Sequence, residues 1–158
     1  VTIAFAYAKK FAWNEVPKYI IAQILGGILA SLILWFLFPA SENLGATIPS
    51  VDVWRAFVLE LLLTFFLMLV IINVSTGSKE IGVVAGIAIG SVVLLEAMFA
   101  GPITNASMNP ARSIAPAIIA GKLQHLWMYI VAPILGALLA VVSCRLVKEE
   151  NCCDASEC

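Results

Sequence analysis

Four long apolar segments limit what this chain can fold into more than any other feature of its sequence. Each continues for about 20 residues with few or no charged side chains, which is the length that a helix needs to cross a ~30 Å hydrocarbon core. An apolar fraction of 62% and a mean hydropathy of +1.03 agree, because soluble domains hold about 45–50% apolar residues. The sequence therefore predicts an all-α membrane protein whose spanning helices occupy residues 16–38, 53–74, 80–100 and 125–147.

A shorter helix is predicted at residues 109–121, between the third and fourth spans. Asn109 is a favoured N-cap, Pro110 suits the first helical turn, and Gly121 is a favoured C-terminal stop. A helix of about 11 residues reaches only about 16 Å, or half of the bilayer core. Because lipid satisfies no backbone polar group, such a helix end must be buried in protein or line a water-filled cavity. Arg112 lies one turn inside its positive end, an arrangement that pores and transporters use.

An internal repeat indicates how the spans are arranged. Residues 19–31, YIIAQILGGILAS, match residues 129–141, YIVAPILGALLAV, at eight of thirteen positions without a gap. The two copies are the first and fourth spans, so they cross the membrane in opposite directions, as in inverted-repeat channels and transporters. By symmetry a first half-helix should precede the first copy, and we assign its body to residues 1–10. We therefore expect an inverted-repeat bundle of four spanning helices and two half-helices.

Lysine and arginine residues are divided unequally between the two sides that alternating spans define. One side holds six and the other two, with Arg112 left at the half-helix. Because cytoplasmic loops carry the excess of these residues, we expect the 75–80 turn and the tail at 149–158 to lie in the cytoplasm. The plasma membrane is the expected location. A formal net charge of −1 gives no basic surface for nucleic acid.

The tail at 149–158 contains three of the four cysteines, Cys152, Cys153 and Cys158. We interpret these as reduced thiols, with palmitoylation as the alternative. No histidine joins them, so the sequence predicts no metal site and no cofactor. The chain also lacks a nucleophile–base pair and a glycine-rich phosphate loop, and we do not expect an enzyme.

Asn109-Pro110-Ala111-Arg112-Ser113 forms an Asn-Pro-Ala box followed by arginine, and with it the chain resembles the aquaporin (major intrinsic protein) family. The resemblance covers residues 1–148. Three further matches support it, namely Gly101-Pro102, the pair Arg55 and Glu60, and Ala132-Pro133 with Gly136-Ala137. Val1-Thr2-Ile3-Ala4-Phe5 is similar to the sequence that follows the family's first box. The resemblance thus implies that the first box and two spans belong to a preceding segment of the same protein.

The resemblance also implies a function and a set of pore residues. Members are homotetramers in the lipid bilayer, and each subunit passes water and small neutral solutes while excluding ions and protons. Asn109 would donate from its amide to the permeant, and Arg112 would place a positive charge at the outer constriction. The acceptor ladder leading to them would consist of the backbone carbonyls of Asn105, Ala106, Ser107 and Met108.

Two further positions bear on selectivity through the same resemblance. The family's constriction uses the residues three and twelve positions before Asn109, here Ala106 and Ala97. Two alanines make a wide and weakly polar filter. Together with Ser113 after Arg112, they resemble the nodulin-like branch, which passes water, glycerol and solutes such as boric or silicic acid. A water-only channel is an alternative.

Two carboxylates lie within the predicted spans, where burial of a charge is costly. We expect Glu60 to face the interior and to support the half-helix loop. For Glu96, a structural hydrogen bond and a solute-facing role are equally compatible with the sequence. An ion-coupled secondary transporter is a second functional alternative, and it would need Glu60 or Glu96 as its coupling site. A structural adhesion protein of the same fold is a third.

Overall fold

The computed structural model describes residues 1–75 and 79–147, except for the side chains of 79–83, and the predicted tail at 149–158 lies outside this range. Within it the chain is helical throughout its regular structure, and the six helices are α1 Thr2–Tyr7, α2 Val16–Leu37, α3 Val53–Ser75, α4 Lys79–Thr104, α5 Pro110–Ala120 and α6 Leu126–Val147. Four of them, α2, α3, α4 and α6, are long and apolar enough to cross a membrane. The predicted all-α membrane fold is therefore confirmed.

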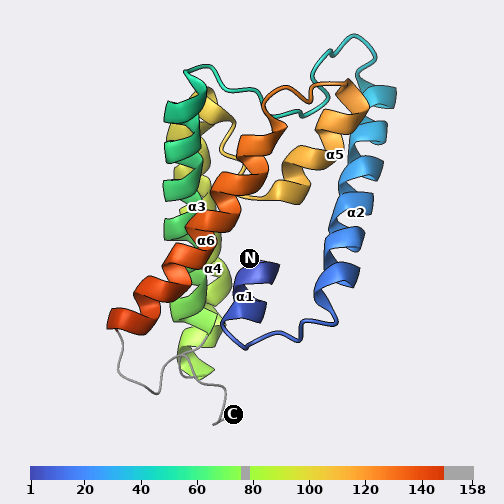
Figure 1. Cartoon of the computed structure of the whole chain (residues 1–158). Coiled ribbons are helices and arrows are strands. Elements are labelled where there is room, and N and C mark those ends of the chain that lie inside the picture. The colour runs from blue at the N-terminus through green and yellow to red at the C-terminus, as the bar shows by residue number, and fades with distance from the viewer. Residues whose placement is uncertain (76–78, 148–158) are drawn as a thin grey trace.

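The two short helices lie between the long ones. In Figure 1, α3, α4 and α6 are packed together on one side and α2 stands on the other. Helices α5 and α1 enter the space between them from opposite ends, and their N-terminal ends approach each other near mid-height of the long helices (Figure 1). The positive ends of two helix dipoles are thus brought to the same level of the molecule.

Local capping explains why α5 is short. Asn109 has an extended backbone (φ −151°, ψ 116°), and its side-chain oxygen accepts the backbone N–H of Ala111 at 3.1 Å. Pro110 occupies the first helical position, where no N–H is needed. At the other end Gly121 adopts the left-handed conformation with φ 67°, which a glycine reaches without steric cost.

Two helix ends differ from the sequence prediction by more than one residue. Helix α4 continues past Gly101 and Pro102 to Thr104, although a glycine–proline pair was expected to end it at residue 100. The backbone N–H of Asn105 donates to the carbonyl of Gly101 at 2.9 Å, and buried partners hold Thr104 in place. The first half-helix was expected over 1–10, but α1 ends at Tyr7, since Lys9 turns into the left-handed region with φ 59°.

The core lies between α3 and α6. Gly136 faces the backbone of α3 so closely that an added Cβ would overlap the carbonyl oxygen of Leu61. Close approach of two backbones through a small residue is a common way for membrane helices to associate. The buried cluster around this contact comprises Ala4, Ala8, Leu63, Leu67, Met68, Ile71, Ile72, Ala100, Ala106, Met108, Ala137, Ala140, Val141 and Cys144.

Candidate functional site

The segment that leads into α5 has an unusual backbone. Asn105, Ala106 and Met108 all have positive φ angles, of 65°, 41° and 52°. Residues other than glycine rarely occupy this region, which costs on the order of 1–3 kcal/mol for each of them. Such a path persists only when the surrounding structure imposes it, and such strain concentrates at functional sites.

The side chain of Glu60 imposes this path from α3. Its Oε1 accepts the backbone N–H of Ser107 at 2.9 Å and the hydroxyl of Thr104 at 2.7 Å, while its Oε2 accepts the backbone N–H of Met108 at 2.9 Å. Glu60 is fully buried. A buried carboxylate is tolerated when its oxygens accept hydrogen bonds in this way. In return, the backbone N–H groups of Ser107 and Met108 obtain acceptors that lipid would not supply.

A tyrosine on α6 holds the start of the same segment. The hydroxyl of Tyr129 donates to the carbonyl of Thr104 at 2.7 Å, and both residues are fully buried. The hydroxyl of Thr104 in turn reaches Glu60 and lies 3.3 Å from the backbone N–H of Ala106. Three helices, α3, α4 and α6, therefore converge on the loop that precedes Asn109.

Arg112 extends from the first turn of α5 toward the loop between α2 and α3. Its Nη1 donates to the backbone carbonyl of Gly45 at 2.5 Å. The side chain is otherwise exposed, so its charge faces open space. Among the side chains that the structure describes, those of residues 1–75 and 84–147, Arg112 forms no salt bridge, and the one ion pair joins Lys18 to Glu15.

Two cavities meet at the N-terminal end of α5. The first, called here the α1 cavity, has a volume of about 550 Å³ and includes Thr2, Phe5 and Tyr19 in its lining. The second, called the loop cavity, has a volume of about 430 Å³ and includes Leu44 and Gly45. Three polar side chains line both of them, and these are Gln23, Asn109 and Arg112.

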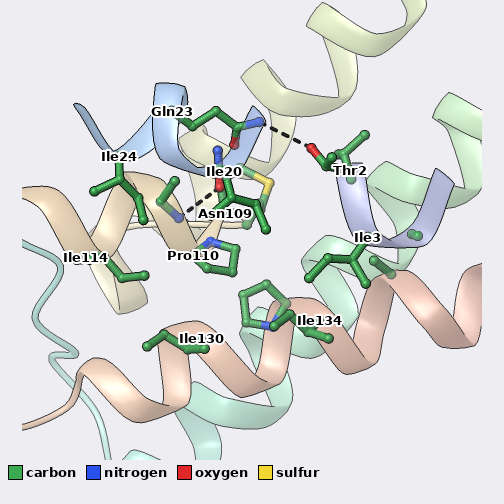
Figure 2. Close-up of a pocket in the computed structure, with 16 residues that line it drawn as sticks. Thr2, Ile3, Ile20, Gln23, Ile24, Asn109, Pro110, Ile114, Ile130 and Ile134 are labelled. Carbon is green, nitrogen blue, oxygen red and sulfur yellow. Dashed lines mark hydrogen bonds between the residues drawn. The ribbon is translucent and has the colours of Figure 1, made fainter. Parts of the chain in front are cut away.

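A third and smaller pocket lies beside the same end of α5. It has a volume of about 200 Å³ and is lined by isoleucines from four helices (Figure 2). At its polar edge the amide of Gln23 donates to the hydroxyl of Thr2 at 3.2 Å, which ties α2 to α1 (Figure 2). The labelled isoleucines are Ile3, Ile20, Ile24, Ile114, Ile130 and Ile134.

Most of the residues predicted to line a pore do line one of these cavities, and Asn105 is an exception. Asn109 and Arg112 line both large cavities, and Ala111 lines the loop cavity. Pro110 and Ala111 line the third, smaller pocket, and Ser107 and Met108 line the α1 cavity. Asn105 lies outside the linings of both large cavities, and its side-chain oxygen accepts the backbone N–H of Ile48 at 2.9 Å.

The two alanines predicted to form the filter are placed differently. Ala106 is buried in the core cluster, and Ala97 is exposed on α4. Neither alanine is among the residues lining the α1 cavity or the loop cavity in the described part of the chain. Their filter role stays a prediction.

Glu96 is buried on α4, with 4% of its surface exposed. Its Oε2 has no hydrogen-bond partner among the residues that the structure describes. Neither of the two roles considered for Glu96 is established by this geometry. Within the same residues no group of three or more histidine, cysteine, aspartate or glutamate side chains could hold a metal ion.

Sequence reasoning missed two residues. Gln23 lines all three cavities, and a signal for it existed, because a mid-span glutamine must face something polar. Thr47 is buried and bonded to Ser113. Nothing in the sequence distinguishes Thr47 from other loop threonines.

The fold and the site define a multi-pass helical membrane protein in which the N-terminal ends of two short helices face each other. Comparison of sequences adds the family, since residues 1–143 match the family model described as major intrinsic protein. The chain belongs to the major intrinsic protein family.

Relatives of known sequence refine this assignment. The chain is 48% identical to Nodulin-26 of Glycine max over 94% of its own length and 55% of that protein. It is 40% identical to aquaporin NIP1-1 of Zea mays, over 96% of this chain and 54% of that one. Aquaporin NIP6-1 of Arabidopsis thaliana is 44% identical, with 94% and 48% covered. The predicted resemblance to nodulin-like members is confirmed, and the chain spans about half the length of these relatives.

A solved structure agrees at the level of the fold. The X-ray structure of the aquaglyceroporin from Plasmodium falciparum superposes with a TM-score of 0.79 and 22% sequence identity, covering 92% of this chain and 69% of that one. At that identity the match establishes the shared fold alone.

Proposed function

We propose that this chain forms part of a passive transmembrane passage for water and small uncharged solutes. The observation that carries the proposal is the position of Asn109 and Arg112, which line both large cavities where those cavities meet. The oxygen of the Asn109 side chain is used in capping α5, which leaves its amide N–H groups to donate to a permeant. The names of the relatives, several of which are aquaporins, support the same function.

Exclusion of ions and protons follows from charge and dehydration. A charged solute that enters a narrow passage loses water, which costs far more than for a neutral hydroxylic molecule that exchanges one set of hydrogen bonds for another. Cations in addition face the guanidinium of Arg112 and the positive ends of α1 and α5. Glycerol, boric acid and silicic acid are the solutes we propose beside water, on the grounds of the small residues Ala97 and Ala106.

The setting of the passage is also part of the proposal. We place it in a homotetramer in the plasma membrane, with the C-terminal side of α6 in the cytoplasm. The distribution of lysine and arginine supports the orientation, and the family membership supports the oligomer.

Osmotic swelling of proteoliposomes tests the function with the substitution Asn109→Asp. Aspartate caps a helix as well as asparagine does, so α5 should keep its start, while the amide donors are lost and a negative charge is added. We expect water and glycerol fluxes to fall more than about tenfold, because the permeant loses its amide donors and meets a fixed negative charge in the passage. Asn43→Asp places the same charge in the exposed loop and serves as the control.

The same vesicles separate the alternatives. An ion-coupled transporter would require a proton or cation gradient for glycerol flux, and a water-only channel would show no glycerol flux at all. An adhesion protein would pass neither solute. If Asn109→Asp conducts as well as the unmodified chain, the proposed role of Asn109 is wrong.

A further inference from the structure

Three buried hydroxyl groups form a continuous chain behind the site. The hydroxyl of Thr47 donates to that of Ser113 at 2.9 Å, the hydroxyls of Ser113 and Ser107 lie 2.5 Å apart, and Ser107 donates to the backbone carbonyl of Asn109 at 3.0 Å. Thr47 and Ser107 are each 5% exposed, and Ser113 is 0% exposed. This hydroxyl chain thus runs from Thr47 in the α2–α3 loop, through Ser113 of α5 and Ser107, to Asn109, the residue that caps α5.

The direction of this chain follows from proton counting. A hydroxyl has one proton to donate. Ser107 spends its proton on the Asn109 carbonyl, which cannot donate, so Ser113 must donate to Ser107. Ser113 has then used its own proton, and the contact with Thr47 requires Thr47 to donate. Thr47 is therefore the first donor of an ordered series in which each bond polarises the next.

The hydroxyl chain is connected to both polar groups of the site. Ser113 directly follows Arg112 on α5, and the chain ends on Asn109. The loop that carries Thr47 also contacts Arg112 directly, because the carbonyl of Gly45 accepts a hydrogen bond from its guanidinium. Thr47 itself lines neither the α1 cavity nor the loop cavity, so any influence on a permeant must pass through these partners.

The loop around Thr47 is fixed at neighbouring points as well. The backbone N–H of Ile48 donates to the side chain of Asn105, and the hydroxyl of Ser50 lies within hydrogen-bond distance of the carbonyls of Pro102 and Ile103, at 2.9 and 3.0 Å. Residues 45–50 therefore lie along the segment that leads into α5. Within this stretch, Thr47 provides the bond that is buried on both sides.

We propose that Thr47 is a positioning residue for the passage, and that its hydroxyl sets the discrimination between water and larger hydroxylated solutes by orienting Ser113, Ser107 and the first turn of α5. The inference rests on the proposed function. A polyhydroxylated solute must meet several fixed hydrogen-bonding groups at once, so it depends on their placement more strongly than a single water molecule does.

Two substitutions of Thr47 test the inference in proteoliposomes. Thr47→Val keeps the shape of the side chain and removes the donor, and we expect glycerol permeability relative to water to fall about two- to tenfold, the factor that one net hydrogen bond supplies. Thr47→Ser keeps the donor and should restore the ratio. Thr64→Val is the matched control, since the buried hydroxyl of Thr64 donates to Glu60's backbone carbonyl within its own helix.

Combining substitutions separates positioning from general loosening. Ser113→Ala should change the ratio of glycerol to water permeability in the same direction. The double variant with Thr47→Val should show no further change, because each substitution interrupts the same series of hydroxyl hydrogen bonds. Additive effects, or an unchanged ratio in Thr47→Val, would overturn the inference. An equal change in Thr64→Val would do the same.

Amide hydrogen exchange of the full chain separates failure of this inference from failure of the proposed function. If the unmodified chain passes no solute, this chain by itself does not perform the proposed function, but Thr47→Val should still speed exchange at the amides of 111–114, and Thr47→Ser should not. Unchanged exchange in Thr47→Val would refute the positioning role whatever the flux.

Discussion

Helices α2 and α6 contain the same stripe of residues and differ in what covers it. Tyr129, Ala132, Gly136 and Ala140 of α6 are all buried, and the identical residues Tyr19, Ala22, Gly26 and Ala30 of α2, 110 positions earlier, are all exposed. The difference lies in the neighbour, because α3 packs against α6, whereas nothing lies within 4 Å of a Cβ built at Gly26. A packing face is thus specified by sequence, but its burial depends on the helix that lies against it.

Glycine substitution should separate the two helices most strongly. Gly136→Ala would drive a methyl group into the carbonyl of Leu61, where the backbone cannot yield as a flexible side chain would. We expect a loss of about 3 kcal/mol in the free energy of unfolding, at the upper end of the cost of overpacking. Gly26→Ala should cost nothing. Thermal or denaturant unfolding in detergent micelles measures both, and equal effects would show that α3 does not approach α6 this closely.

Enlarging the fourth residue of the stripe should give the next effect. Ala140 is 0% exposed in the core cluster, so Ala140→Leu has to displace its neighbours, at about 1–3 kcal/mol. Ala30 is exposed, and Ala30→Leu should leave the unfolding free energy within about 0.5 kcal/mol. A large loss in Ala30→Leu would mean that the exposed face of α2 is covered in the protein studied in solution.

Removing the hydroxyl from each of the two equivalent tyrosines, Tyr129 of α6 and Tyr19 of α2, should give a smaller effect. Tyr129→Phe leaves the buried carbonyl of Thr104 without its donor, and we expect a loss of about 1 kcal/mol. Tyr19 packs edge-on against Phe11, with ring centroids 4.8 Å apart, and that contact does not involve its hydroxyl. Tyr19→Phe should therefore have no measurable effect in the same unfolding assay, which a loss equal to that of Tyr129→Phe would contradict.

The smallest effects are expected where each helix holds α1. Arg145 of α6 donates to the carbonyl of Tyr7 at 2.9 Å and lies over its ring, 4.9 Å from the centroid. Gln23 of α2 donates to Thr2 at 3.2 Å. Both contacts are exposed, so Arg145→Gln should cost about 0.5–1 kcal/mol and Gln23→Leu less. Hydrogen exchange at the amides of α1 resolves such changes, and the reverse order would show that α2 is the stronger support.

Much of the fold could be predicted because membrane burial makes the pattern simple. Long apolar segments with few charges indicated the four long helices, and Asn109, Pro110 and Gly121 indicated α5 through local capping alone. The end of α4 could not be found in the same way. Pro102 is a strong local stop signal, but hydrogen bonds of Thr104 to Glu60 and Tyr129, which are distant in sequence, extend the helix past it.

The site was predictable to the extent that a motif marks it. Asn109 and Arg112 belong to the box and lie at both cavities, whereas Gln23 and Thr47 acquire their positions from contacts with residues 21 and 66 positions away. A lone threonine in a loop has no local pattern that reports such a partner. The positive φ angles of Ala106 and Met108 were equally invisible, since neither residue prefers that conformation.

The carboxylate of Glu60 gives the segment 105–108 its path from outside the segment itself. Shape and surface chemistry of this stretch are therefore encoded in different places in the sequence. Substitution of the Met108 side chain leaves the backbone bonds of Ser107 and Met108 to Glu60 in place, whereas a change at position 60 removes both bonds at once. The course of the backbone before α5 is thus open to a single substitution on α3, in a part of the sequence more than 40 residues away.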